Sequence, residues 1–171
     1  MNLNFQSLIP QNFPDTARVW IYQSNRAFTV DESINIQELL HNFSNTWLSH
    51  GAKVKGFGNL LFGQFIIIMA DETATGVSGC STDSSVKLIR TIEEDHSIQL
   101  LDRTSLAFVV NERIQLIHLS QLEEAKYSGI LSAETIYFNN NIQTKEALLH
   151  SWIIPIKDSW LAKRFTALES K

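Results

Sequence analysis

The chain has very little cysteine, proline and glycine. Its 171 residues include one cysteine, three prolines and seven glycines. Because Cys80 stands alone, the chain cannot form an internal disulfide or a zinc or iron–sulfur site made of several of its own thiolates. We therefore expect no metal and no cofactor. With 44% hydrophobic and 19% charged residues, the composition also excludes disordered and collagen-like chains.

Long apolar runs and an excess of basic charge are missing as well. The most apolar run, Phe65 to Ala70, is far too short to span a bilayer, and Met1 to Pro14 lacks the pattern of a signal peptide. Fourteen basic and 18 acidic residues give a net charge of −4, and no basic stripe stands out. We therefore expect a cytoplasmic protein with no membrane insertion and no nucleic-acid partner.

Hydrophobic periodicity predicts a chain of mixed strands and helices. Residues 1–17 are predicted to be an irregular lead-in, and residues 18–171 a single α+β domain. Thr29 and Glu32 form a capping box at the start of a helix over 30–50. Asp83 is expected to cap a second helix. The remaining predicted elements are strands at 18–23, 53–62, 64–70, 104–110, 113–118 and 135–138, and helices that begin near 120, 144 and 158.

The order β-α-β-β-α-β predicts a ferredoxin-like core, extended by a C-terminal hairpin and helices. We expect the strands Arg18–Gln23 and Phe65–Ala70 to be parallel neighbours in one sheet. The loops that follow two parallel strands emerge at the same end of a sheet, where ligands often bind in α/β proteins. This topology would bring the loop at 24–26 to the loop at 71–83.

These two loops form the predicted ligand-binding site. Arg26 offers a positive charge, the N-terminus of the second helix attracts anions, and glycine allows close approach of the backbone. The expected ligand is a small anion, or the loops bind a protein partner. An alternative interpretation is that Asp83 and its neighbours only cap the helix. The candidate ligand-binding residues are Ser24, Asn25, Arg26, Gly79, Ser81, Asp83, Ser84 and Ser85.

Two other classes of function stay open. Cys80 precedes the second helix, where a thiol pKa tends to fall, so a thiol-dependent or hydrolytic enzyme with His118 as its base is one alternative. A structural or oligomerisation module is the other. ATP hydrolysis is not expected, because the glycine pair Gly51 and Gly56 is followed by Phe57 and Gly58 where a phosphate loop requires Lys and Ser or Thr.

Four strings of the chain resemble a family of small bacterial proteins that are often labelled "ABC transporter ATPase". The strings are Trp20 to Arg26, Gly79 to Val86, Phe138 to Asn140 and Pro155 to Trp160. The resemblance covers most of the chain after the lead-in. It implies no established activity, and two of its strings contain the same two loops that form the predicted site.

Overall fold

The protein is seen in a computed structural model that describes residues 1–73 and 79–166, with only the backbone described for residues 79–82 and 166. Its elements are mixed helices and antiparallel sheets, which makes the chain an α+β protein. They fall into two units. The N-terminal unit holds residues 4–101 and 140–149, and the C-terminal unit holds residues 1–3, 102–139 and the chain from 150 onward.

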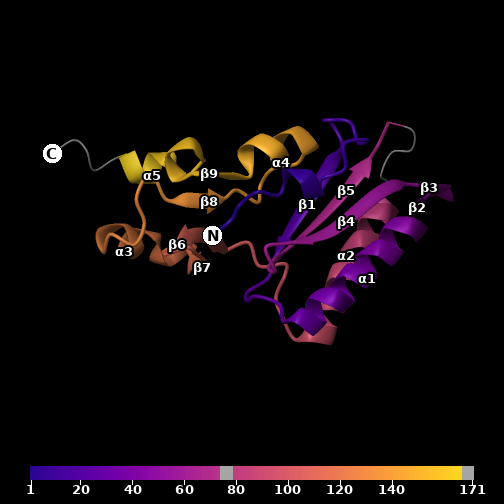
Figure 1. The fold of residues 1–171 in the computed structure, drawn as a ribbon, viewed down its shortest axis with the longest axis horizontal. Coiled ribbons are helices and arrows are strands. Elements are labelled where there is room, and N and C mark those ends of the chain that lie inside the picture. Colours follow the sequence, from indigo (N-terminus) through magenta and orange to yellow (C-terminus); the bar gives the residue numbers. More distant parts are fainter. Residues whose placement is uncertain (74–78, 167–171) are drawn as a thin grey trace. The chain divides into compact units, whose positions relative to one another are not determined.

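The N-terminal unit is built on a three-stranded antiparallel sheet. Its order is β1 (Arg18–Gln23), β5 (Phe65–Asp71), β4 (Lys55–Leu61), and every residue of β5 is buried. The central position of β5 agrees with its continuously apolar sequence. The helices α1 (Val30–Thr46) and α2 (Gly79–His96) lie along this sheet in Figure 1.

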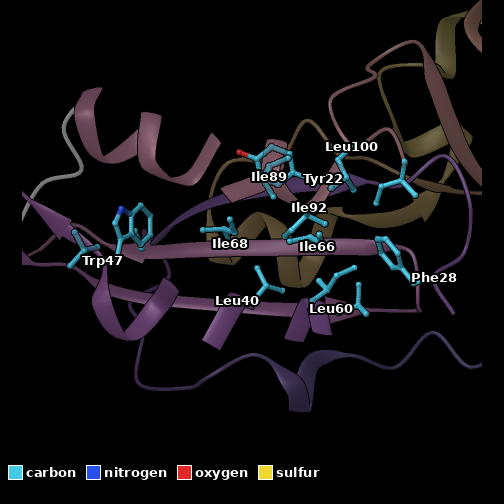
Figure 2. Packing of buried hydrophobic residues seen from close by; sticks show 14 residues of the cluster. Tyr22, Phe28, Leu40, Trp47, Leu60, Ile66, Ile68, Ile89, Ile92 and Leu100 are labelled. Atoms are coloured by element: carbon cyan, nitrogen blue, oxygen red, sulfur yellow. The ribbon is translucent and has the colours of Figure 1, made fainter. Parts of the chain in front are cut away.

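One core joins both helices to the sheet. Figure 2 shows Leu40 of α1 and Ile92 of α2 close to Ile66 and Ile68 of β5, within one cluster of buried residues. Ile36 and Leu40 of α1, and Trp47 directly after it, are almost fully buried, as their helical spacing in the sequence indicates. This packing fixes both helices against β5, so the strand order decides what lies at each helix end.

The prediction that β1 and β5 run parallel is wrong. They are neighbours, but Arg18 pairs with Ala70 and Gln23 with Phe65, so they run antiparallel. The physical reason is the tight turn after β4, where Phe62 and Gly63 have positive φ angles of 54° and 63°. This turn makes β5 antiparallel to β4, and the helical crossover through α1 leaves β1 and β4 running in the same direction. Because β5 lies between β4 and β1, it is antiparallel to both. The loops that follow β1 and β5 therefore emerge at opposite ends of the sheet.

The ferredoxin-like order is not confirmed. Within the described residues, no strand from the chain after α2 joins the sheet of the N-terminal unit, because the next strand pairs elsewhere. The outer edge of β1 is instead contacted by a bridge between Arg18 and Thr144. The amide of Val19 also donates to the carbonyl of Gln143, at 2.9 Å.

Two predicted helix ends are corrected. The first helix stops at Thr46, because Trp47 is buried and Leu48–Ser49 (β2) pairs with Ala52–Lys53 (β3) across a tight turn. The second helix begins at Gly79, so Asp83 is its fifth residue and not its N-cap. Serine and threonine, which favour caps, are also accommodated in the helix itself.

The C-terminal unit has a four-stranded sheet of order β7-β6-β8-β9, with its own core around Phe108, Ile117 and Tyr137. The strand β9 was not predicted, and Pro155 ends it. The bounds of the remaining elements are β6 (Ser105–Val110), β7 (Arg113–His118), β8 (Ile136–Phe138), β9 (Ile153–Pro155), α3 (Leu122–Tyr127), α4 (Lys145–Ser151), α5 (Ala162–Thr166), and the 3-10 turns η1 (Gln6–Leu8), η2 (Leu119–Gln121) and η3 (Ile156–Asp158).

Candidate functional site

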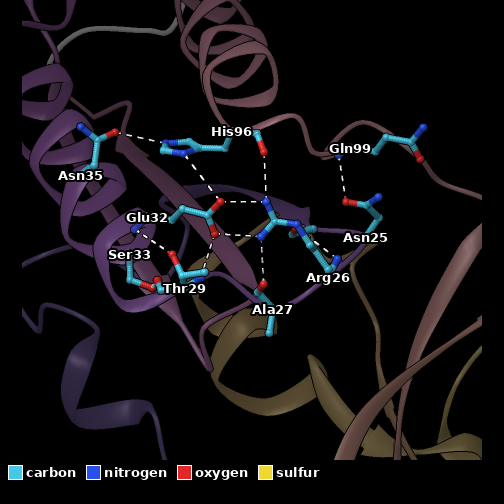
Figure 3. A network of polar contacts seen from close by, with 10 residues as sticks. Asn25, Arg26, Ala27, Thr29, Glu32, Ser33, Asn35, His96 and Gln99 are labelled. Carbon is cyan, nitrogen blue, oxygen red and sulfur yellow. Dashed lines mark hydrogen bonds and ion pairs between the residues drawn. The ribbon is translucent and has the colours of Figure 1, made fainter.

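The loop after β1 meets the C-terminal end of α2, where Arg26 is the centre of a polar network (Figure 3). Its two terminal nitrogens donate to the two carboxylate oxygens of Glu32, at 2.8 and 2.7 Å. The guanidinium also donates to the carbonyl of His96 at 3.0 Å. Bidentate pairs of this kind are strong and directional. Arg26 is therefore committed to joining the start of α1 to the end of α2.

The same carboxylate caps α1. Glu32 accepts a hydrogen bond from the Thr29 amide at 2.8 Å, and the Thr29 hydroxyl accepts one from the Glu32 amide, which confirms the predicted capping box. The Arg26 guanidinium and the Thr29 amide lower the pKa of Glu32 to about 2. The pKa of Arg26 is raised, first by its hydrogen bond to Glu32. Both groups stay charged at neutral pH.

The other two residues of this loop are also held by protein partners. Ser24 is fully buried, and its backbone exchanges hydrogen bonds with Gln64. Asn25 donates its amide to the Gln99 carbonyl, and its side-chain oxygen accepts from the Gln99 amide, both at 3.0 Å. This half of the predicted site is closed by the protein itself.

The N-terminal half of α2 is different, because Ser84 and Lys87 line a pocket of about 280 Å³. The opposite wall comes from the end of α1 and the start of β2, and its members are Phe43, Thr46, Trp47 and Leu48. We call this hollow the Lys87 pocket. Figure 2 shows Trp47 at one end of the buried cluster, and its indole ring contacts the rings of Trp20 and Phe43. The pocket therefore combines one cation and two hydroxyls with three apolar side chains.

A second hollow of about 300 Å³ lies along the same helix and shares Lys87. Its other lining residues are Asp83, Val86 and Arg90. Lys87 and Arg90 form no ion pair with any side chain in the described part of the chain, although Asp83 is four residues before Lys87 on the helix. Two cationic side chains are thus available on one stripe of α2.

The structure does not bring the two halves of the predicted site together. Arg26 contacts His96, and the 13 residue steps from Asp83 to His96 correspond to about 20 Å of helix. Gly79 and Ser81 lie in the first turn of α2, where only the backbone is described, and Ser85 is fully buried. Of the candidate residues, Ser84 lines the Lys87 pocket and Asp83 lines the neighbouring hollow.

The residues of the enzyme alternative belong to different units. Cys80 is in the first turn of α2, and its side chain is outside the described atoms. His118 caps η2, because its ring accepts from the Ser120 amide at 3.2 Å and contacts the Ser120 hydroxyl at 2.7 Å. Among the described residues, no group of three or more His, Cys, Asp or Glu side chains could hold a metal ion. No helix in this part of the chain is long and apolar enough to cross a membrane.

Sequence reasoning missed Lys87 and the wall opposite it. A usable signal was present, because Asp83, Lys87 and Arg90 follow one another at spacings of four and three residues on a predicted helix, which places them on one face. The helical spacing of Phe43 and Trp47 indicates a core-facing position and does not by itself suggest a pocket wall. No family model matches this chain, and neither a curated protein nor a solved structure matches it.

Proposed function

We propose that the protein is a binding protein for a small anion with an apolar body, such as an aliphatic or aromatic carboxylate. The ligand occupies the Lys87 pocket. The observation that carries this proposal is the presence of an ammonium group with no ion-pair partner among the described residues, in a hollow lined by Phe43, Trp47 and Leu48. The cytoplasmic location stays a prediction.

The chemistry of the lining matches the two parts of such a ligand. A charged hydrogen bond from Lys87 would hold the carboxylate. Lys53 adds positive charge, because it is paired directly opposite Leu48 in the β2–β3 hairpin. The aromatic and leucine side chains would remove the apolar body from water, as in most small-molecule sites.

Calorimetric titration with octanoate tests the proposal. We expect Lys87→Gln to weaken octanoate binding about tenfold, which is the usual loss for one hydrogen bond between charged groups. Lys163→Gln is the matched control, because Lys163 is an exposed lysine of the C-terminal unit outside the pocket. Neutral octanamide should bind the wild-type protein more weakly than octanoate.

Equal affinities for octanoate and octanamide would contradict the proposal, and so would an unchanged affinity in Lys87→Gln. Mg-ATP is a useful second probe in the same experiment. We expect no binding of Mg-ATP, because the chain has no lysine-bearing phosphate loop.

A further inference from the structure

The strand β7 is at the open edge of the sheet in the C-terminal unit, because its only strand partner among the described residues is β6. The β6–β7 turn has two residues, Asn111 and Glu112, both with positive φ angles of 49° and 59°. In a two-residue hairpin, the flanking residues Val110 and Arg113 form a hydrogen-bonded pair, and such pairs alternate along the strands. This alternation decides which backbone groups of β7 point away from β6.

Ile114 and Leu116 occupy the positions that point outward. Their partners in the register, Val109 and Ala107, belong to the non-hydrogen-bonded pairs. The hydrogen bond from the Leu119 amide to the Thr104 carbonyl, at 2.8 Å, agrees with this alternation of hydrogen-bonded and non-hydrogen-bonded pairs. No hydrogen bond to the outward amides and carbonyls of Ile114 and Leu116 occurs in the described part of the chain. An exposed strand edge of this kind is a template for one more strand.

A groove of about 300 Å³ runs beside this edge, within the C-terminal unit. One wall is β7 itself, through Gln115, Leu116 and Ile117, and the other wall is α3 and the chain just after it. The residues of that second wall are Gln121, Glu124, Ala125, Ser128 and Ile130. An added strand on β7 would therefore place alternate side chains in this groove.

The polar groups of the groove determine which side chains would fit. Glu124 is the only charged residue in the lining, and no cation pairs with its carboxylate in the described part of the chain. The amides of Gln115 and Gln121 also form no side-chain hydrogen bond within the described residues. Ile130 is exposed to 45% of its maximum and offers an apolar contact at the end of the groove. The lining thus complements a positively charged side chain on an extended backbone.

We propose that β7 binds an extended, basic peptide segment of a protein partner as an added strand, with a lysine or arginine of that segment beside Glu124. This interaction surface is independent of the Lys87 pocket, since it uses only residues of the C-terminal unit. Main-chain hydrogen bonds to Ile114 and Leu116 supply the attraction, and the charge at Glu124 supplies the selectivity.

The test uses two capped heptapeptides of alternating valine and threonine, one with lysine at its centre and one with glutamate there. Both are titrated into the ¹⁵N-labelled full chain. We expect the lysine peptide to shift the amide signals of Ile114 and Leu116 and to slow their hydrogen exchange. We expect the glutamate peptide to bind about fivefold more weakly, as one exposed ion pair allows. Glu124→Gln should remove this difference, and Glu123→Gln, a neighbouring carboxylate outside the lining, should keep it.

A backbone variant separates strand addition from simple charge attraction. Leu116→Pro removes an outward amide and no bond to β6, so the hairpin should still fold. The variant should bind the lysine peptide at least about tenfold more weakly than the wild-type protein does. This is the effect of losing one main-chain hydrogen bond and its strand geometry. Equal binding of the two peptides, or shifts that avoid β7, would overturn the proposal. Sedimentation that shows a dimer lost in Leu116→Pro would assign the edge to a second copy and would overturn it too.

Discussion

The two ends of α2 contrast in how their charged side chains are used. At the C-terminal end, Arg26 is bound to Glu32 and to the carbonyl of His96, so its donors are already engaged. Nearer the N-terminal end, between Asp83 and Arg90, Lys87 and Arg90 line hollows and form no ion pair with a described residue. The sequence places cations beside both parts of α2, but only Arg26 forms an ion pair in the described part of the chain.

This contrast shows why a cation in a loop is weak evidence for a ligand site. Arg26 is six residues before Glu32, and the capping box holds that carboxylate in place. A bidentate pair then forms inside the protein. Lys87 has no such neighbour fixed by local structure, and the wall opposite it is made by Phe43 of α1 and by Trp47, which follows that helix. We call the C-terminal end of α2, where His96 contacts Arg26, the closed end, and the residues from Asp83 to Arg90 the open half. The closed end stabilises the fold, and the open half is available for binding.

The largest effect on the free energy of unfolding is expected from a substitution that disrupts the packing of α2 near its closed end. Ile92 is fully buried in the core shared with β5, so Ile92→Ala should lower the free energy of unfolding by about 2–5 kcal/mol. Val86 lies in the open half and lines the second hollow, so Val86→Ala should cost less than about 1 kcal/mol. Urea unfolding measures both. Equal losses would show that α2 is anchored evenly along its length.

A smaller effect is expected at the capping box. Thr29→Ala removes the hydroxyl that accepts from the Glu32 amide at 3.2 Å and should cost about 1 kcal/mol of unfolding free energy. The matched control is Thr91→Ala on α2, where the hydroxyl only donates to the Lys87 carbonyl in the same helix. It should change stability by less than about 0.5 kcal/mol. If both variants are equally stable, the cap does not hold the closed end.

Acid should lower the stability that the ionised Glu32 carboxylate gives to the closed end of α2. The pKa of Glu32 is about 2 in the folded protein and lies below the value near 4.3 of an unfolded chain. Its stabilising effect is therefore complete above about pH 4.3 and is lost as the pH falls towards 2. Hydrogen bonds also lower the pKa values of Asp71 and Asp102 to about 2, so wild-type stability should decline through the same range.

Thermal unfolding between pH 2 and pH 7 measures this effect in Glu32→Gln. The variant should be less stable than the wild-type protein at pH 7 and should lose less stability on acidification. Glu38→Gln, an exposed residue of the same helix outside the network, is the control and should follow the wild-type profile. Parallel profiles for all three proteins would rule out a stabilising role for the Arg26–Glu32 pair.

The smallest effect is expected at the open half of α2. Lys87→Gln and Arg90→Gln should each change the free energy of unfolding by less than about 0.5 kcal/mol, because surface residues without partners contribute little. Urea unfolding again measures the change. A loss above about 1 kcal/mol would mean that these cations serve the fold, and the contrast between the two ends would no longer hold.

Local features of the fold could be predicted from the sequence, and long-range ones could not. The capping box of Thr29 and Glu32 depends on residues three apart, and the strand Arg18–Gln23 on its own composition, so both were predicted with the bounds that the structure has. The direction of β5 beside β1 depends on how a hairpin and a helical crossover fit together, which no local pattern states. The predicted parallel pairing failed for that reason.

The same limit applies to the candidate site. The sequence pointed to residues of the Asp83–Ser85 segment, and Ser84 does line a pocket. The error was to supply the cation from Arg26, since the antiparallel order puts that loop at the other end of α2. The spacing of Asp83, Lys87 and Arg90 was a usable signal, but the wall opposite Lys87 became visible only when the end of α1 was placed beside α2.

The most direct test of the account is a map of octanoate binding by two-dimensional ¹⁵N NMR of the full chain. Octanoate is the simplest probe with one carboxylate and one apolar body. The account predicts chemical-shift changes at the Trp47 indole and at the amides of Ser84 and Lys87, with the signals of Asn25 and Arg26 unchanged. Shifts centred on Asn25 and Arg26, or no shift at Ser84 and Lys87, would contradict it.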